Sequence, residues 1–165
     1  MKKIILIGFA ACGKSSVGRL LADRLGCEFV DTDGELERVS NLAVSDIFKL
    51  YGEERFRQLE SELLASLTDR INVVISCGGG SVLVDSFQSF AAHSTAVLLT
   101  ATAQTVRDRL NGFTRPLFDR LSVQELDECI ERRSHIYQGY ADVEFSTDGK
   151  TPEQVGEEIY NYIIK

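Results

Sequence analysis

Apolar residues along the chain fall into blocks that predict strands and helices in turn. Short, mainly apolar runs predict strands at residues 3–7, 28–30, 73–75, 97–99 and 143–145, and those at 3–7 and 73–75 are typical of strands buried on both faces. Between them, apolar residues recur every three or four positions, which is the spacing of an amphipathic helix. This alternation predicts a three-layer α/β/α sandwich around a five-stranded parallel sheet.

Residues that favour helix ends mark the limits of several predicted helices. Gly26 follows the helix that begins near Ser15, and a glycine commonly ends a helix. Thr151, Pro152 and Gln154 supply an N-cap, a proline at the first helical position and a capping-box partner. The last helix is expected to bury Val155, Ile159, Tyr162 and Ile163.

Residues 35–70 contain no convincing strand, and their apolar spacing predicts two helices. The first is expected to start at Ser45 and stop at Gly52, and it carries Ile47, Phe48 and Tyr51. The second is expected over residues 53–69, with one apolar face made of Phe56, Leu59, Leu63 and Leu67. Two helices exceed a minimal crossover, so this segment is predicted to be an insertion that forms the second wall of a cleft.

A phosphate-binding loop follows the first predicted strand. Residues 8–15 have the pattern G-x-x-x-x-G-K-S, and Ser15 opens an amphipathic helix. In this setting the first N–H groups of the helix and the positive end of its dipole attract anionic oxygens. Lys14 can reach the outer phosphates, and the Ser15 hydroxyl can bind Mg²⁺. The strand–loop–helix context therefore predicts a nucleotide-binding site.

Further polar groups and glycines follow the second and third predicted strands. Asp31 and Asp33 come directly after residues 28–30, and the carboxyl ends of parallel strands are where open α/β sheets bind ligands. An Asx turn or a helix N-cap is the purely structural alternative for this pair. Residues 78–80 are three glycines, which favour close approach of backbone N–H groups to a ligand, with a tight turn as the alternative.

Composition and charge narrow the classes of partner. The 165 residues are enough for one domain, and the net charge of −7 argues against general binding to nucleic acid or an anionic membrane. Four cysteines without C-x-x-C spacing argue against a zinc site or a disulfide framework, so a reducing cytoplasm is expected. A monomer is the default expectation, because no exposed apolar stripe is evident.

The N-terminus imitates a lipoprotein signal, because two lysines precede an apolar stretch that ends at Cys12. Cleavage there would remove the first strand and split the phosphate loop, so export is rejected. No other run approaches the ~18 apolar residues needed to span a bilayer.

Taken together and in this order, the motifs resemble the shikimate kinase family of the nucleoside-monophosphate-kinase-like P-loop group. The resemblance runs from end to end and rests on the phosphate loop and on residues 31–33, 52–60, 78–80, 115–117 and 133–142. It implies a P-loop kinase that transfers the γ-phosphoryl group of ATP, with Mg²⁺, to the 3-hydroxyl of shikimate, a step toward chorismate and the aromatic amino acids.

The same resemblance implies one domain over residues 1–165, with a substrate-binding insertion at about 33–61 and a lid at about 111–122. Asp33 would contact the substrate hydroxyls and act as general base or orient the nucleophile. Lys14 and Arg115 are the other expected catalytic residues. The acceptor site would be completed by Arg57, Gly79, Gly80 and Arg133.

Arginine suits this acceptor, because its planar fork can hold a carboxylate by two hydrogen bonds. Without the resemblance, Arg57 and Arg133 would each be interpreted as an ordinary solvent-exposed arginine on a helix. Ser15 and Asp31 are the expected Mg²⁺ ligands, Asp31 through water. The expected nucleotide-binding residues are Ala11, Cys12, Gly13, Lys14, Ser15, Ser16, Arg109 and Arg115.

Two loop residues depart from the family pattern. Ala11 stands where the family usually has glycine, so the loop must accept a geometry that alanine allows. Cys12, near Lys14 and a helix N-terminus, is predicted to have a lowered thiol pKa, with a buried and inert side chain as the alternative.

Two other functions stay open from the sequence. One is a related kinase acting on gluconate or a nucleoside monophosphate, although Asp33, Arg57, Gly79 and Arg133 suit shikimate better. The other is a silent nucleotide-binding module. Mere binding does not need the full set of residues that are present together, so this set argues against it: Lys14, Ser15, Asp31, Asp33 and Arg115.

Overall fold

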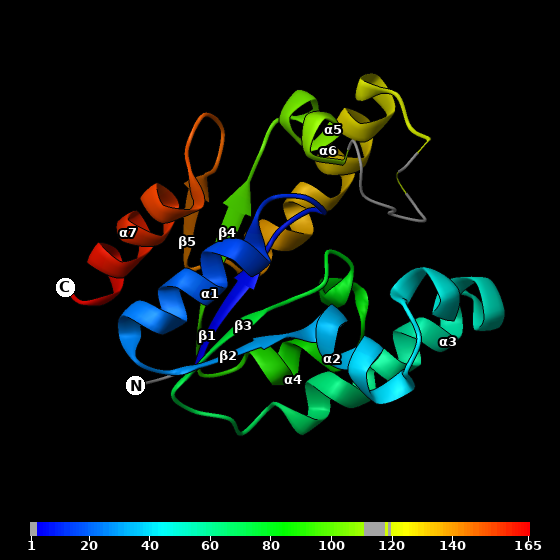
Figure 1. Ribbon diagram of the computed structural model, residues 1–165, viewed down its shortest axis with the longest axis horizontal. Coiled ribbons are helices and arrows are strands. Elements are labelled where there is room, and N and C mark those ends of the chain that lie inside the picture. Colours follow the sequence, from blue (N-terminus) through cyan, green and yellow to red (C-terminus); the bar gives the residue numbers. More distant parts are fainter. Residues whose placement is uncertain (1–2, 111–117, 119) are drawn as a thin grey trace.

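A parallel sheet with helices on both faces organises the chain (Figure 1). The structure, a computed structural model, describes residues 3–110, 118 and 120–165. Within these residues the sheet has five strands in the order β2-β3-β1-β4-β5, each parallel to its neighbours. They are β1 (Lys3–Ile7), β2 (Glu28–Asp31), β3 (Val73–Ser76), β4 (Ser94–Thr100) and β5 (Val143–Ser146). The predicted three-layer sandwich is confirmed.

Helices α1 and α7 pack side by side on one face of the sheet, and α4 and α6 lie against the other (Figure 1). The helices are α1 (Lys14–Leu25), α2 (Thr32–Ser40), α3 (Val44–Ser66), α4 (Phe87–Ala91), α5 (Ala103–Leu110), α6 (Val123–Tyr140) and α7 (Pro152–Ile163), with a 3₁₀ turn, η1 (Ser81–Leu83). Among the described residues, none of these helices is long and apolar enough to cross a membrane.

The central strands set the place of the site. Every residue of β1 and β3 is buried, as expected of strands covered on both faces. β1 lies between β3 and β4, where the strand order changes direction, and open α/β sheets bind ligands at such a point. Leu6 of β1 pairs with Ser76 of β3, so the loops that follow these two strands leave the sheet side by side.

The predicted helix ends at Gly26 and Thr151 are confirmed. Gly26 has φ of 65° after α1, and Thr151 forms the complete capping box with Gln154 at the start of α7. Val155 and Ile159 are buried as expected, but the prediction for Tyr162 is wrong. Tyr162 is 45% exposed because it meets Phe145 of the edge strand β5 edge-on rather than entering the core.

The predicted pair of helices around Gly52 is confirmed, although the first helix starts elsewhere. Within α3, Gly52 has a non-helical φ of 80° and ψ of 172°, so it separates a first helical segment from a second one that ends at Ser66. Ser45 is not the cap, since α3 starts at Val44 after Ala43. Tyr51 is 60% exposed because it points away from the packed face.

α2 and α3 nevertheless pack around a small core of their own, made of Leu36, Ile47 and Phe56. Phe48 stacks on Phe56 with ring centroids 4.5 Å apart. Phe48 and Phe56 of this cluster also line a cavity described below. The short α4, which the sequence pattern did not predict, buries Phe87 and Phe90 in the main core.

Candidate active site

The phosphate loop carries the chain from β1 into α1. Gly8 has φ of 143°, and a Cβ there would lie 2.3 Å from the Leu99 carbonyl oxygen, so only glycine fits. Gly13, with φ of 86°, is the N-cap of α1. Lys14 Nζ donates to the carbonyl oxygens of Gly8 (2.8 Å) and Phe9 (2.7 Å), which draws the ammonium group over the start of the loop.

Ala11 takes the conformation that glycine favours. Its φ is 59°, in the left-handed region, which costs an alanine about 1–2 kcal/mol. Arg109 Nη1 donates to the Ala11 carbonyl oxygen at 3.1 Å and ties this part of the loop to α5. The loop therefore keeps a glycine geometry in spite of the alanine.

The prediction of a lowered pKa for the Cys12 thiol is wrong. Cys12 is 1% exposed, and burial raises its thiol pKa more than the neighbouring charges of Lys14 and Arg109 lower it. Its side chain lines a small cavity of about 70 Å³ behind the loop. The alternative, a buried and inert residue, fits Cys12.

Asp31 serves both as a helix cap and as part of the site. Its Oδ1 accepts a hydrogen bond from the Gly34 N–H at 3.1 Å and so caps α2. Its Oδ2 accepts from the Ser15 hydroxyl, which also lies 3.3 Å from the Ser76 hydroxyl. A carboxylate and hydroxyls thus meet beside the phosphate loop, and oxygen donors of this kind suit Mg²⁺.

This donor set suits a Mg²⁺ ion that keeps most of its ligands from phosphate and water. Within the described residues no group of three or more His, Cys, Asp or Glu side chains could hold a metal by itself.

Asp33 lies in the first turn of α2, next to the glycines that follow β3. A Cβ on Gly78 would lie 2.8 Å from Asp33 Oδ1 and 3.0 Å from Glu60 Oε1. The Gly78 N–H donates to Thr32 Oγ1 at 2.9 Å, so it is directed at α2 and not at a ligand. Because residue 78 has no side chain, both carboxylates have space at this turn.

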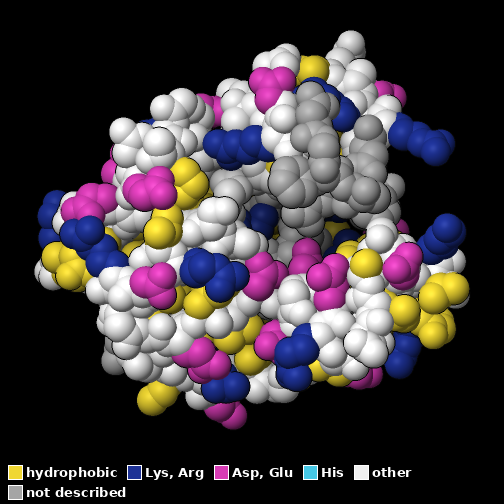
Figure 2. All heavy atoms as spheres, viewed as in Figure 1, with side chains coloured by type: hydrophobic (Ala, Val, Ile, Leu, Met, Phe, Trp, Pro, Cys, Tyr) yellow, Lys and Arg dark blue, Asp and Glu magenta, His cyan; other side chains and the backbone are white. Residues whose placement is uncertain are grey.

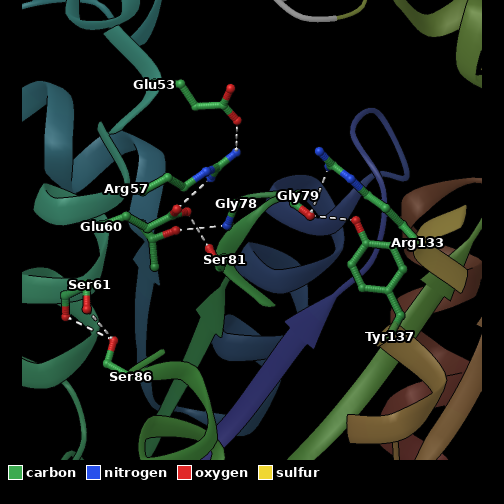
Figure 3. A network of polar contacts seen from close by, with 11 residues as sticks. Glu53, Arg57, Glu60, Ser61, Gly78, Gly79, Ser81, Ser86, Arg133 and Tyr137 are labelled. Carbon is green, nitrogen blue, oxygen red and sulfur yellow. Dashed lines mark hydrogen bonds and ion pairs between the residues drawn. The ribbon is translucent and has the colours of Figure 1, made fainter. Parts of the chain in front are cut away.

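Arg57 reaches the same turn from α3 (Figure 3). Its Nη1 donates to Glu60 Oε2 at 2.6 Å, and Glu53 lies 3.6 Å away on the other side. A Cβ on Gly80 would lie 2.2 to 2.5 Å from the guanidinium, so the glycine leaves the space that Arg57 fills. Glu60 therefore orients Arg57 from the same helix.

Arg133 reaches the turn from α6, on the opposite side (Figure 3). Its Nη1 lies 3.4 Å from the Gly79 carbonyl oxygen. Its guanidinium carbon lies 5.7 Å from the centre of the Phe9 ring and 5.5 Å from that of Phe118. These contacts hold the cation beside the loop rather than in solvent, as expected of cation–π geometry.

Tyr137, one turn after Arg133 on α6, lies within the stretch that carries the family resemblance, but the sequence assigned it no role. Its hydroxyl donates to the Gly79 carbonyl oxygen at 2.5 Å. Burial raises its pKa to about 12, with the nearby Arg133 charge opposing that rise, so the hydroxyl keeps its proton near neutral pH. A buried tyrosine at helical spacing is typical of a core residue, and only its neighbour at position 79 points to the site.

Arg109 connects the phosphate loop to the segment that follows β5. Its guanidinium donates to Thr147 Oγ1 (3.0 Å) and to the Thr147 carbonyl oxygen (3.1 Å), in addition to Ala11. The neighbouring Asp148 accepts from the Thr102 N–H at 3.0 Å. Burial would raise the pKa of Asp148, but hydrogen bonds from Thr105 and Thr102 outweigh burial and lower it.

Two adjoining cavities bring these groups together. The first, about 580 Å³, includes Arg57, Glu60, Gly80, Phe118 and Arg133 in its walls. The second, about 540 Å³, includes Gly13, Lys14, Ser16 and Arg109. They meet at six shared residues: Ala10, Ser15, Asp31, Asp33, Gly78 and Gly79. Figure 2 shows this face of the molecule hollowed, with acidic side chains along one rim of the hollow.

The structure thus gathers most of the predicted site residues around one hollow, with Asp33 where the cavities meet. Ala11 also lines the second cavity, whereas the side chain of Cys12 faces the small cavity behind the loop. Arg115 and most of the expected lid lie outside the described residues.

A phosphate loop after a central strand, joined to a second cavity with carboxylates at the junction, defines a P-loop kinase of small molecules. A family model described as "Shikimate kinase" matches residues 10–164. The chain belongs to the shikimate kinase family.

Individual relatives agree with this assignment. The chain is 38% identical over 165 residues to a shikimate kinase of Persephonella marina, covering 99% of each chain. It is similar to the solved shikimate kinase from Acinetobacter baumannii in complex with shikimate, with a TM-score of 0.93 and 29% identity over 99% of this chain and 93% of that one. The shikimate kinase from Aquifex aeolicus matches with a TM-score of 0.84 and 35% identity, over 98% and 96% of the two chains.

Proposed function

We propose that the protein transfers the γ-phosphoryl group of ATP to the 3-hydroxyl of shikimate, forming shikimate 3-phosphate and ADP. The observation that carries this proposal is the meeting of the two cavities at Asp33. A nucleotide held by the phosphate loop and an acceptor held in the first cavity would face one another there. Family membership favours shikimate over gluconate or a nucleoside monophosphate as the acceptor.

On the acceptor side, Arg57 and Arg133 come from different helices to either side of the glycine turn (Figure 3). Two guanidinium groups in one cavity suit a small molecule with one carboxylate. Asp33 would then accept a hydrogen bond from the hydroxyl that is phosphorylated and aim it at the γ-phosphorus. Since phosphoryl transfer has a loose transition state, this positioning matters more than the strength of Asp33 as a base.

On the nucleotide side, the N-terminus of α1 and Lys14 would bind the β- and γ-phosphates. Ser15 and Asp31 would hold Mg²⁺, which neutralises charge on the phosphate oxygens. Arg109 would border the adenine. Arg115 is assigned by family resemblance as a lid residue that stabilises the transferred group, and residues 33–61 as the substrate-binding insertion.

We also propose that the enzyme works as a cytoplasmic monomer without a nucleic-acid or membrane partner, in keeping with its net charge of −7. Sedimentation at assay concentration tests the monomer, and a dimer mass would contradict it.

An acceptor panel tests the proposed function. ADP release is measured with ATP and Mg²⁺ in the presence of shikimate, quinate, gluconate or no acceptor. Stimulation by shikimate well above the other acceptors is expected. Stimulation by gluconate alone would identify a different kinase, and a rate unaffected by any acceptor would favour a silent nucleotide-binding module.

A further inference from the structure

Glu60 lies in the first cavity with both carboxylate oxygens occupied (Figure 3). Its Oε2 accepts from Arg57 at 2.6 Å, and its Oε1 accepts from the Ser81 hydroxyl at 2.6 Å. The Glu60 side chain is 1% exposed, and Ser81 is fully buried. Solvent therefore has little access to this carboxylate, and its orientation depends on these protein donors.

The second hydrogen bond matters because of the geometry of glutamate. The last torsion of a glutamate side chain joins an sp³ to an sp² carbon and has a broad, soft profile. Arg57 alone would restrain only one oxygen of the Glu60 carboxylate and would leave its plane less well fixed about that bond. Ser81, which begins η1 directly after the glycine turn, fixes the second oxygen and with it the carboxylate plane.

The fixed carboxylate in turn sets the position of the guanidinium. Arg57 is 18% exposed, packs on the open side of Gly80, and has Glu53 at its other edge. An arginine restrained in this way presents its donors to the cavity in one orientation. Such pre-ordering lowers the entropy that is lost when a planar carboxylate binds.

We propose that Ser81 is a positioning residue for the acceptor: its hydroxyl orients the Glu60 carboxylate, which orients Arg57 toward the acceptor carboxylate. This inference rests on the proposed function, since it takes a carboxylate-bearing acceptor as the ligand of Arg57. Ser81 itself touches no reacting atom and acts only through Glu60.

The hydrogen bond between Ser61 and Ser86 offers a matched control. Ser61 is the residue after Glu60 on α3. Ser61 and Ser86 share a hydrogen bond of 2.7 Å between their hydroxyls (Figure 3). Like the bond between Ser81 and Glu60, it ties the segment after the glycine turn to α3. Among the described residues that line the two cavities, neither Ser61 nor Ser86 is present. Removing the Ser86 hydroxyl therefore tests the loss of such a tie without a change in the site.

The test compares Ser81→Ala with Ser86→Ala in steady-state assays at saturating ATP. Ser81→Ala is expected to raise the KM for shikimate roughly tenfold, as for a lost hydrogen bond to a charged group, while the KM for ATP stays within about twofold. Ser86→Ala is expected to leave both KM values within about twofold. Equal KM values for shikimate in the two variants would overturn the proposal.

The methyl ester of shikimate separates positioning from a general structural effect. Because the ester lacks the anionic carboxylate, the tenfold penalty of Ser81→Ala is expected to shrink toward none with this acceptor. An equal penalty for acid and ester would assign Ser81 a structural role and contradict the proposal. If Ser81→Ala fails to fold, Ser81→Cys, which keeps the volume but has a weak donor, carries the same comparison.

Calorimetry that measures the Kd of shikimate for the same variants distinguishes failure of this proposal from failure of the proposed function. If the wild-type protein binds shikimate without phosphorylating it, the proposed function fails, and the ratio of Kd values between wild type and Ser81→Ala still decides the role of Ser81. If the wild type neither binds nor phosphorylates shikimate, both proposals fail.

Discussion

Two glycine-rich turns follow neighbouring strands of the sheet, and glycine serves a different purpose in each. In the phosphate loop Gly13 needs its φ of 86°, whereas space is not limiting, because a Cβ there would have Arg109 Nη1 as its nearest neighbour at 3.9 Å. In the turn after β3, Gly80 has an ordinary φ of −99°, but a Cβ there would fall within 2.5 Å of Arg57. Gly13 therefore needs to be glycine for conformation alone, and Gly80 for space alone, whereas Gly8 at the start of the phosphate loop needs to be glycine for both reasons.

This difference between the two turns corresponds to a difference in what each one accommodates. The phosphate loop shapes backbone to enclose a ligand, with Lys14 drawn over it. The turn at residues 78–80 makes room for protein side chains, so that Asp33, Glu60 and Arg57 can converge. On the proposed function, the first turn would bind its ligand directly, and the second would arrange the groups that bind the acceptor. Substitutions in the two turns should therefore have different kinetic signatures.

The largest effect is expected from Lys14→Ala in the phosphate loop. Loss of this ammonium removes charge stabilisation from the transferred group, and kcat is expected to fall by about 10³-fold. ADP release with saturating shikimate measures it, with Lys49→Ala, an exposed lysine on α3, as the control. A folded Lys14→Ala variant that retained a tenth of the activity would contradict the assignment.

Arg133→Ala tests the acceptor side. The KM for shikimate is expected to rise by about 10- to 100-fold, since a hydrogen bond to a charged group is lost, while kcat changes less. Its neighbour Arg132 is exposed and donates to Cys129 on the same helix, so Arg132→Ala serves as the matched control. If the KM for shikimate were the same in both variants, Arg133 would not bind the acceptor.

Gly80→Ala tests the claim that this glycine provides space. The added methyl group would displace the Arg57 guanidinium, so the KM for shikimate is expected to rise roughly tenfold with little change in the KM for ATP. Gly139→Ala on α6 is the control, because a Cβ there meets nothing within 4 Å. An equal rise in both KM values would show that Gly80→Ala disturbs the whole site.

Ala11→Gly is expected to give the smallest effect, in stability. Glycine accepts the φ of 59° without strain but loses more entropy on folding, so the free energy of unfolding should rise by about 0.5–1 kcal/mol. Urea unfolding measures the change. Ala65→Gly, at an exposed position of α3, is expected to lower stability by a similar amount. A loss of stability in both variants would mean that Ala11 is not strained.

The sequence predicted the sheet well because its central strands, β1 and β3, are almost continuous apolar runs, and because the two edge strands, each with a glutamate, follow the same alternation with helices. It also predicted the phosphate loop, whose spacing is tied to one backbone shape. It placed the break at Gly52 correctly but expected the helix before it to start at Ser45, because Ala43, the actual N-cap, offers no side chain that could mark the start. It failed at the Cys12 thiol because burial, which decides the pKa, depends on the folded core.

The acceptor site could be predicted only in part. Arg57 and Arg133 are far apart in the chain and resemble ordinary helix residues when the family pattern is set aside. The roles of Tyr137 and Ser81 depend on partners in other elements, Gly79 and Glu60, which no local pattern indicates. The reason for the glycines, space for side chains from α2 and α3, likewise emerges only when these helices are in place.

The central claim is that the joined cavities aim one hydroxyl of shikimate at the γ-phosphorus of ATP. A correlation spectrum between phosphorus and proton nuclei of the reaction product tests it most directly. The expected product is a single phosphate monoester whose phosphorus couples to the proton on carbon 3 of shikimate. A monoester at another hydroxyl, or inorganic phosphate alone, would contradict the claim.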